Sequence, residues 1–204
     1  MAITTVIFDL DGTITRPFLD FDVIRAEMGL SADAGPILEA MEHMSAEERI
    51  HAEQVLLKHE NRAVDESILN DGTRRTLDAL RRRGINIGIL TRNKRENAQA
   101  VAKKHNLAFD AIVDRQDGPA KPDAFGVLRL CEIFAAKPSE TLVVGDFLYD
   151  LLSAKAANAT SVLLKNSEKT QKFAEYADFT ITSLDEILHI IDNMDDNTER
   201  ATDV

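Results

Sequence analysis

The chain has little of what secreted, nucleic-acid-binding and membrane proteins need. Its 204 residues contain a single cysteine, Cys131, so no disulfide can form within the chain, which favours a reducing, cytoplasmic environment. Lysine and arginine number 24 against 35 aspartate and glutamate residues, giving a formal net charge of −11. We therefore expect no nucleic-acid partner, because non-specific binding to nucleic acid needs a basic footprint.

Long hydrophobic runs are also missing. No apolar stretch is long enough to span a bilayer, and an acidic surface matches an anionic membrane poorly, so we expect no membrane partner. A predicted strand starts within the first few residues, which leaves no room for a secretory signal. The hydrophobic fraction of 44% and charged fraction of 29% are typical of a soluble globular protein. Cys131 falls in an apolar helical pattern, and we expect a core side chain rather than a nucleophile.

Short apolar runs bounded by turn signals recur along the chain and alternate with helical patterns. The runs are Thr4–Phe8, Ile85–Leu90, Ala111–Val113, Leu142–Val144, Val162–Leu164 and a last one at Phe179–Thr182. Strands alternating with helices predict an α/β protein whose parallel sheet is covered on both faces.

Residues 17–72 interrupt this alternation. They contain no convincing strand but several helical patterns, and Ser45-Ala46-Glu47-Glu48 opens one of them as a capping box. A crossover needs only about a dozen residues, so we predict a small helical cap domain at 17–72, placed to cover the preceding turn. The core domain then comprises residues 1–16 and 73–191. The acidic segment 192–204 has few apolar residues and is predicted to be a disordered tail.

The turn before this insertion carries two acids, in Asp9-Leu10-Asp11-Gly12-Thr13, directly after the first predicted strand. Open α/β sheets bind ligands at the carboxyl ends of their strands. Two close carboxylates repel each other unless a cation lies beside them, and Mg²⁺ prefers carboxylate oxygens. The pattern is also that of an ordinary turn. A calcium loop is disfavoured, because its twelfth position, Asp20, is not Glu.

Three further predicted strand ends carry polar residues. Thr91, Arg92 and Asn93 precede a helical pattern, whose amino end can bind an anion. Lys121 and Pro122 open the next helical pattern, and Asp146 and Asp150 follow the strand at 142–144. Singly, each has a simpler interpretation as a helix cap, a surface lysine or acids that complement a helix dipole.

Taken together and in this order, Asp-x-Asp-Gly-Thr, a strand-end Thr, Lys-Pro and Gly-Asp-x-x-x-Asp resemble the four motifs of the haloacid dehalogenase-like (HAD) hydrolase superfamily. The resemblance covers Thr4 to about Ala159. The insertion after the first motif looks like the cap of the subgroup that includes phosphoglycolate phosphatase and β-phosphoglucomutase. The resemblance implies a Rossmann-like parallel-sheet core carrying a small α-helical cap.

The resemblance also implies roles for these residues. Asp9 would be the nucleophile that forms an aspartyl phosphate, and Asp11 the general acid and base. Mg²⁺ would be held by Asp9, the backbone carbonyl of Asp11 and Asp146, with Asp150 as a further ligand or as support. The phosphoryl oxygens would be held by Thr91, the backbone amide of Arg92 and Lys121.

The activity implied is hydrolysis of a small phosphorylated metabolite. Dehalogenases of the superfamily lack the second acid, because a halide leaves without a proton, so Asp11 favours phosphoryl transfer. A phosphomutase, or a catalytically silent HAD-fold binding or regulatory protein, stays an alternative. The Arg92 side chain is our candidate for contacting a second anionic group of the substrate. Weaker candidates for specificity are Arg16, His43, Arg49, His51, His59 and Arg62.

Overall fold

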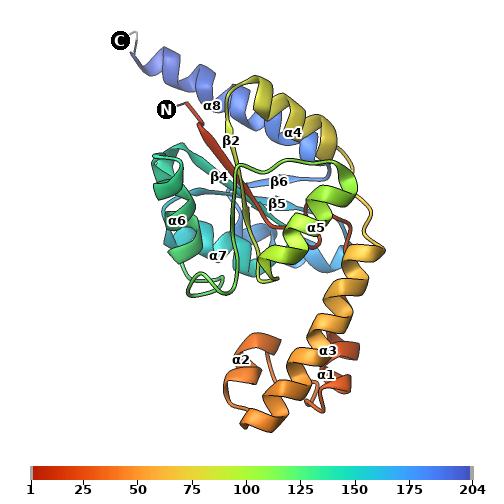
Figure 1. The fold of residues 1–204 in the computed structure, drawn as a ribbon. Helices are drawn as coiled ribbons and strands as arrows, with labels where there is room; N and C mark the ends of the chain where they lie inside the picture. Colours follow the sequence, from red (N-terminus) through yellow and green to blue (C-terminus); the bar gives the residue numbers. More distant parts are fainter. Residues whose placement is uncertain (1, 203–204) are drawn as a thin grey trace. The chain divides into compact units, whose positions relative to one another are not determined.

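The computed structural model describes residues 2–202 and is built on one parallel sheet (Figure 1). The six strands lie in the order β3-β2-β1-β4-β5-β6, and every neighbouring pair is parallel. Their bounds are β1 Thr5–Phe8, β2 Asn86–Leu90, β3 Ala111–Val113, β4 Thr141–Gly145, β5 Thr160–Leu164 and β6 Phe179–Ile181. The α/β, Rossmann-like fold class predicted from the sequence is confirmed.

The central strand β1 explains why the apolar runs fold this way. All four of its residues are buried, and Val6 lies between Ile87 of β2 and Leu142 of β4 in register. A strand buried on both faces needs a continuous apolar run instead of an alternating one. The β-branched residues of Thr5–Phe8 meet that need.

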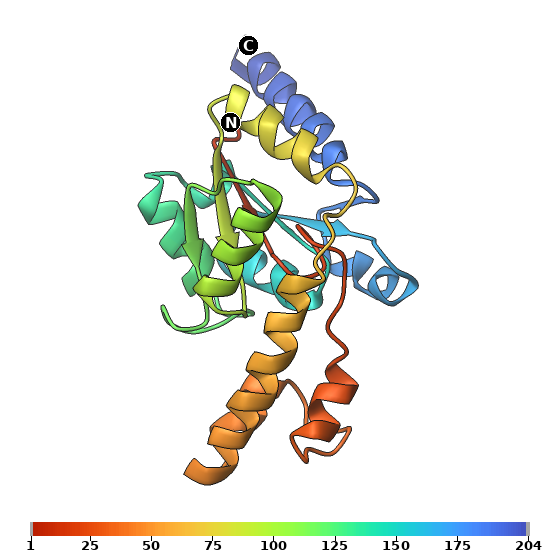
Figure 2. The same ribbon diagram turned by 45° about the vertical axis from the view of Figure 1, so that its right-hand side comes forward.

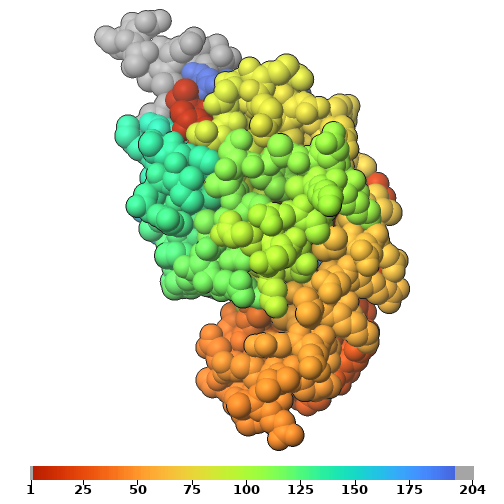
Figure 3. Space-filling model, viewed as in Figure 1, coloured from red at the N-terminus to blue at the C-terminus, as the bar shows by residue number. Residues whose placement is uncertain are grey.

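Helices cover both faces of the sheet (Figures 1 and 2). The chain runs outward from β1 to β3, returns to β4 and runs outward again to β6. Right-handed crossovers therefore put α4 (Thr73–Arg82) and α5 (Arg95–His105) on one face, and α6 (Phe125–Ile133) and α7 (Leu148–Ala156) on the other. Accordingly, α4 contacts β2 and α8, whereas α6 and α7 contact each other. Figure 3 shows α4 and α5 side by side at the surface. Short 3₁₀ helices lie at Pro138–Glu140, Glu168–Tyr176 and Leu184–Glu186.

Helix α6 begins later than the sequence pattern predicts. Lys121-Pro122 was expected to open it, but the peptide bond between them is cis and the helix starts at Phe125. The Asp123 side chain accepts a hydrogen bond from the Phe125 backbone N–H at 2.7 Å, so a local side-chain turn replaces the first helical turn. Cys131 of α6 is buried in the core between this helix and the sheet, as predicted.

The insertion forms a separate compact unit, Phe18–Ser67. It contains α1 (Phe21–Glu27), α2 (Ile37–Glu42) and α3 (Ala46–Asp65), and its buried residues form a hydrophobic core of its own. The predicted capping box is present, since the Glu48 N–H donates to Ser45 Oγ and the Ser45 N–H donates to Glu48 Oε2. Residues 68–72, which the sequence assigned to the cap, belong to the sheet unit.

The segment expected as a disordered tail differs from that prediction. Helix α8 runs from Ile187 to Thr202, past Asp192. Asp192 forms an ion pair with Arg83 at 2.7 Å, and Asp195 accepts a hydrogen bond from the Ile3 backbone N–H. These tertiary contacts favour helix where composition alone favours disorder. Asp203 and Val204 lie outside the described residues. Within the described residues, no helix is long and apolar enough to cross a membrane.

Candidate active site

The predicted site residues meet at the carboxyl ends of the central strands. Asp9 follows β1, Thr91 follows β2 and Asp146 follows β4. Strand β1 lies between β2 and β4, where the direction of the chain across the sheet reverses. Such a switch point leaves the loops on either side diverging, so it is where open α/β sheets bind ligands. The Asp9 N–H still donates to the Val144 carbonyl at 2.9 Å, which fixes the start of the turn.

Lys121 is a buried cation that contacts two carboxylates of the site. Its Nζ lies 2.6 Å from Asp9 Oδ1 and 2.5 Å from Asp150 Oδ1, and it donates to the Leu90 carbonyl at 2.9 Å. Burial alone would lower the pKa of Lys121, but the two carboxylates outweigh it and raise the pKa above its usual value. The lysine side chain is only 4% exposed. The interpretation of Lys121 as an ordinary surface lysine is therefore wrong.

Three carboxylates converge beside this lysine. Oxygens of Asp9, Asp146 and Asp150 lie within 4.8 Å of one another. Desolvation raises the pKa of Asp9 well above its usual value, against the lowering influence of Lys121. Desolvation, with the charge of Asp150, raises the pKa of Asp146 to about 6. Three acids against one lysine leave an excess of negative charge, which a divalent cation would neutralise.

The donor set fits a hard cation such as Mg²⁺. Carboxylate oxygens are its preferred protein ligands. Beside Asp146, the Oδ1 atom of Asn166 is buried and has no hydrogen-bond partner among the described residues, so a further polar group would satisfy it. Both oxygens of Asp150 already accept hydrogen bonds, from Lys121 and from the Phe147 backbone N–H. Each carboxylate oxygen has a second lone pair, so Asp150 stays a candidate both as a further ligand and as support.

Two glycines allow the carboxylates to approach the backbone. A Cβ on Gly12 would lie 2.3 Å from Asp146 Oδ2, and Gly12 has a φ of +100°. A Cβ on Gly145 would lie 2.2 Å from the Asp150 carboxyl carbon. Any side chain at either position would displace an acid of the group, so the Gly in both motifs is a steric requirement.

Two asparagines that the sequence analysis missed hold this turn. Asn70 Nδ2 donates to the carbonyls of Gly12 at 2.8 Å, Thr13 at 2.9 Å and Thr15 at 3.1 Å. Asn166 Nδ2 donates to the Gly12 carbonyl and to Asp146 Oδ2, the latter at 3.1 Å. Asn166 follows β5 at the same edge of the sheet, a signal that could have found it. Asn70 follows no strand and lies more than fifty residues from the turn, so no sequence signal points to it.

The other acid of the turn, Asp11, is held by the loop after β2. Asn93 Nδ2 donates to Asp11 Oδ2 at 3.0 Å, and the Asn93 backbone N–H donates to Thr91 Oγ1 at 3.0 Å. Desolvation raises the pKa of Asp11, and the hydrogen bond from Asn93 opposes that rise. Thr91 itself is buried, with 3% of its surface exposed.

The Arg92 side chain lies against other parts of the site loops. Its guanidinium donates to the Lys121 backbone carbonyl and lies 5.2 Å from the centroid of the Tyr149 ring. The Arg92 carbonyl accepts a hydrogen bond from Arg115 at 3.0 Å. Arg92 therefore links the loops after β2 and β4 to the Lys121 segment, a connection that its position after Thr91 does not reveal.

Five of the six weaker specificity candidates have side-chain partners within their own units, and the sixth, His43, is the residue at which α2 ends. Arg16 forms an ion pair with Asp71, His59 lies 3.2 Å from Glu27, and Arg62 forms an ion pair with Glu66. His51 contacts the Glu27 carbonyl, and the Arg49 guanidinium donates to the Glu42 carbonyl. These contacts favour the structural interpretation of each residue.

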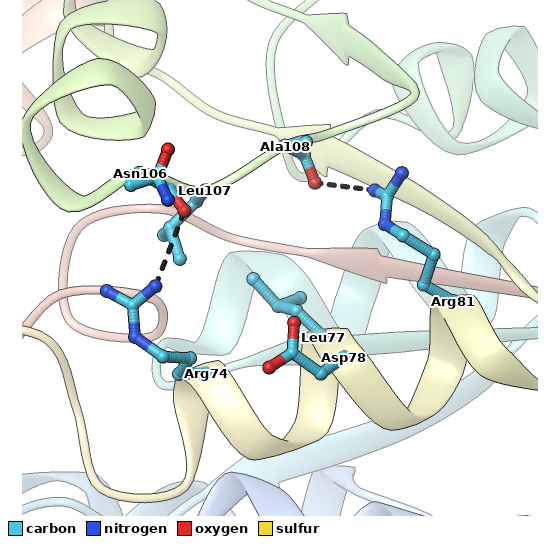
Figure 4. Close-up of a pocket in the computed structure, with 7 residues that line it drawn as sticks. All are labelled: Arg74, Leu77, Asp78, Arg81, Asn106, Leu107 and Ala108. Atoms are coloured by element: carbon cyan, nitrogen blue, oxygen red, sulfur yellow. Dashed lines mark hydrogen bonds between the residues drawn. The ribbon is translucent and has the colours of Figure 1, made fainter.

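A surface hollow beside α4 has different chemistry (Figure 4). Its two arginines, Arg74 and Arg81, donate to the carbonyls of Asn106 and Ala108, which lead into the amino end of β3. Asp78 is the acid among the residues that line it. The converging carboxylates and the buried lysine lie instead where strands β1, β2 and β4 end.

Comparison with known proteins agrees with this geometry. Residues 3–158 match the family model described as "haloacid dehalogenase-like hydrolase". The chain is 27% identical over 210 residues to the pyrophosphatase PpaX of Halalkalibacterium halodurans, covering 94% of this chain and 98% of that protein. It is 24% identical over 217 residues to the phosphoglycolate phosphatase of Chromobacterium violaceum, covering 94% and 97%.

Among solved structures, the chain is similar to a hydrolase from Pseudomonas syringae, with a TM-score of 0.79 and 21% identity over 93% of this chain and 98% of that one. This likeness shows a shared fold. The family model covers the sheet from before β1 to the end of α7, and so includes all four strand-end motifs. The chain belongs to the haloacid dehalogenase-like hydrolase family, among relatives named as phosphatases.

Proposed function

We propose that the protein is a magnesium-dependent phosphatase that hydrolyses a small phosphorylated metabolite through an aspartyl phosphate on Asp9. The observation that carries the proposal is the position of Asp9, held by buried Lys121 within a group of three carboxylates. A second acid, Asp11, lies two residues away and is held separately by Asn93. These separate surroundings support attack by Asp9 and proton transfer by Asp11.

The first half-reaction forms one bond and breaks another. A carboxylate oxygen of Asp9 attacks phosphorus, the bond from phosphorus to the ester oxygen breaks, and Asp11 gives its proton to the departing oxygen. Lys121 Nζ and Thr91 Oγ1 offset charge on the phosphoryl oxygens, where positioning and electrostatics supply most of the rate.

The second half-reaction regenerates the enzyme. Asp11, now ionised, takes a proton from a water molecule that attacks the phosphorus of the acyl phosphate, and Asp9 leaves as a carboxylate with release of inorganic phosphate. Asp9, the Asp11 carbonyl and Asp146, with Asp150 as a further ligand or as support, would hold Mg²⁺, which would neutralise charge so that an anionic nucleophile can approach an anionic phosphate. Asn166 and Thr13 keep the Asp146 carboxylate oriented.

The names of two relatives support the substrate class. A pyrophosphatase and a phosphoglycolate phosphatase both act on small phosphorylated anions. The family relationship supports hydrolysis as the reaction. We therefore propose a small, anionic phosphate ester or anhydride as the substrate.

Turnover of p-nitrophenyl phosphate with Mg²⁺ or with excess EDTA tests the proposal. We expect magnesium-dependent release of phosphate, and a loss of about 10³-fold or more in Asp9→Asn, which removes the nucleophile. Asp78→Asn, a change of the same kind on the surface of α4, should retain wild-type activity. Absence of magnesium-dependent turnover in the wild type, or full activity in Asp9→Asn, contradicts the enzyme and favours a silent binding protein. Transfer of phosphate to a second hydroxyl of a sugar phosphate, without release, indicates a phosphomutase.

A further inference from the structure

Asn93 occupies a position in the loop after β2 at which every polar atom of its side chain has a partner. Its Nδ2 donates to Asp11 Oδ2 at 3.0 Å. Its Oδ1 accepts hydrogen bonds from the Lys94 backbone N–H at 2.7 Å and from Asn97 Nδ2 at 2.8 Å. Asn93 and Asn97 are 5% and 6% exposed, so these bonds are shielded from water.

The two donors on Oδ1 fix which way the Asn93 amide faces. Rotating the amide by half a turn would place its NH₂ group against the Lys94 N–H and the Asn97 NH₂, and its oxygen against the Asp11 carboxylate. Both contacts would then be repulsive, so the NH₂ group is held toward Asp11. The N-cap of α5 is Lys94, without a side-chain cap hydrogen bond, so the bond from Asn93 to Asp11 is not part of a helix cap.

This orientation constrains the proton of Asp11. The Asn93 NH₂ group can donate a hydrogen bond but cannot accept one, so Asp11 Oδ2 must act as the acceptor. The carbonyl oxygen of a protonated carboxyl is a better acceptor than its hydroxyl, so this bond favours the hydrogen of Asp11 on Oδ1. Since Asn93 occupies Oδ2, Oδ1 is the oxygen available to meet a substrate.

We propose that Asn93, braced by Asn97, is a positioning residue that confines the transferable proton of Asp11 to Oδ1 and directs it toward the leaving oxygen. The proposal rests on the proposed phosphatase function. Asn93 touches neither phosphorus nor the leaving group, and acts through Asp11 alone. No charge or covalent bond changes at Asn93 during the reaction.

A series of para-substituted phenyl phosphates tests this role. The kcat/KM for each ester reports the steps up to transfer of phosphate to Asp9, and esters of more basic phenols depend more on a correctly placed acid. In Asn93→Leu, we expect kcat/KM for phenyl phosphate to fall about 10- to 100-fold and that for p-nitrophenyl phosphate to fall less than about threefold. The plot of log kcat/KM against the pKa of the phenol should become steeper.

Asn97→Ala gives a graded version of the same change. It removes one of the two donors that orient the Asn93 amide. We therefore expect kcat/KM to fall more for phenyl phosphate than for p-nitrophenyl phosphate, with about a third of the change in log kcat/KM that Asn93→Leu causes. Asn86→Leu is the matched control, because Asn86 lies at the opposite end of β2 and donates to the Thr4 carbonyl. Any loss in this control should be equal for all esters, with the wild-type slope.

Two outcomes overturn the inference, and they are distinguishable. An equal loss for all esters in Asn93→Leu, with the wild-type slope, makes Asn93 a purely structural residue while the phosphatase function stands. A wild-type protein that hydrolyses none of the esters removes the proposed function and this inference with it. A steeper slope in Asn93→Leu and Asn97→Ala, absent from Asn86→Leu, supports the assignment.

Discussion

Two lysine–carboxylate groups in this protein use the same chemistry in opposite surroundings. In the sheet unit, Lys121 lies between Asp9 and Asp150, and all three side chains are at most 11% exposed. In the helical unit, Lys58 lies 2.8 Å from Glu27, and their side chains are 65% and 36% exposed. An exposed ion pair contributes little because water screens it, whereas buried charges must be fully compensated. Burial, and not the ion pair itself, distinguishes the candidate active site.

Removing each lysine tests this difference and has the largest expected effect. Lys121→Met leaves the buried carboxylates without their cation, and we expect a loss of about 3–5 kcal/mol in unfolding free energy. Activity should fall about 10³-fold, because the phosphoryl group loses its main positive partner. Lys58→Met should change the unfolding free energy by less than about 1 kcal/mol and leave activity unchanged. Equal losses of stability in the two variants, measured by urea unfolding, would contradict the comparison.

The pH dependence of stability should have opposite signs in the two groups. Desolvation raises the pKa of Asp146 to about 6, so its folded-state contribution is fully present below its unfolded pKa of about 4 and is lost as pH rises to 6. Hydrogen bonds from Lys58 and His59 lower the pKa of Glu27, so its contribution is present at neutral pH and is lost on acidification.

Magnesium separates these two contributions experimentally. The cation binds the ionised form of Asp146, whose fraction rises about tenfold between pH 5 and pH 7, so the rise in Tm on adding Mg²⁺ should be larger at pH 7, by about 1.4 kcal/mol in equivalent free energy. Asp146→Asn should abolish most of that rise at both pH values. Glu27→Gln serves as the control and should keep the wild-type response to Mg²⁺. A rise in Tm that is independent of pH would show that Asp146 is not the group that Mg²⁺ neutralises.

The sequence predicted the strand ends better than it predicted what surrounds them. Apolar runs mark buried strands, so the observed strands begin and end within about two residues of their expected positions, and Asp9 and Asp146 could be placed at the sheet edge. Asn70 and Asn166 act through tertiary hydrogen bonds to the turn after β1 and to Asp146, which leave no periodic pattern in the sequence. The partners of Arg92 depend in the same way on loops that only folding brings together.

The late start of α6 and the length of α8 have related causes. At Asp123, a side-chain turn competes with the helical geometry that Pro122 would permit. Before Asp192, the buried side chains of Ile187 and Ile191 anchor α8, which continues into a segment whose composition favours disorder. Both outcomes depend on individual contacts that outweigh a local preference, which composition cannot reveal.

Two glycines with positive φ give a smaller and more local test of the comparison. Gly12 and Gly29 have φ values of +100° and +75°, but a Cβ on Gly12 would lie 2.3 Å from Asp146, whereas a Cβ on Gly29 meets nothing within 4 Å. Gly29→Ala should cost only the left-handed backbone strain, about 1–2 kcal/mol. Gly12→Ala should cost this strain and also displace Asp146. We expect its affinity for Mg²⁺, measured by calorimetry, to fall at least tenfold while that of Gly29→Ala is unchanged.

The smallest expected effect concerns the helical unit alone. Ser45 accepts the Glu48 N–H at the start of α3, and Ser45→Ala removes that cap at a cost of about 1 kcal/mol. Amide hydrogen exchange should show the loss in the first turn of α3, with protection of β1 and β4 unchanged, because the two hydrogen bonds of this capping box join Ser45 and Glu48 within the helical unit. Ser139→Ala, in the sheet unit, is the matched serine control and should leave exchange in α3 at the wild-type rate. Equal loss of protection in α3 and in the sheet would mean that the two units unfold together. The two units would then differ in the burial of their charged groups but not in their free energy of unfolding.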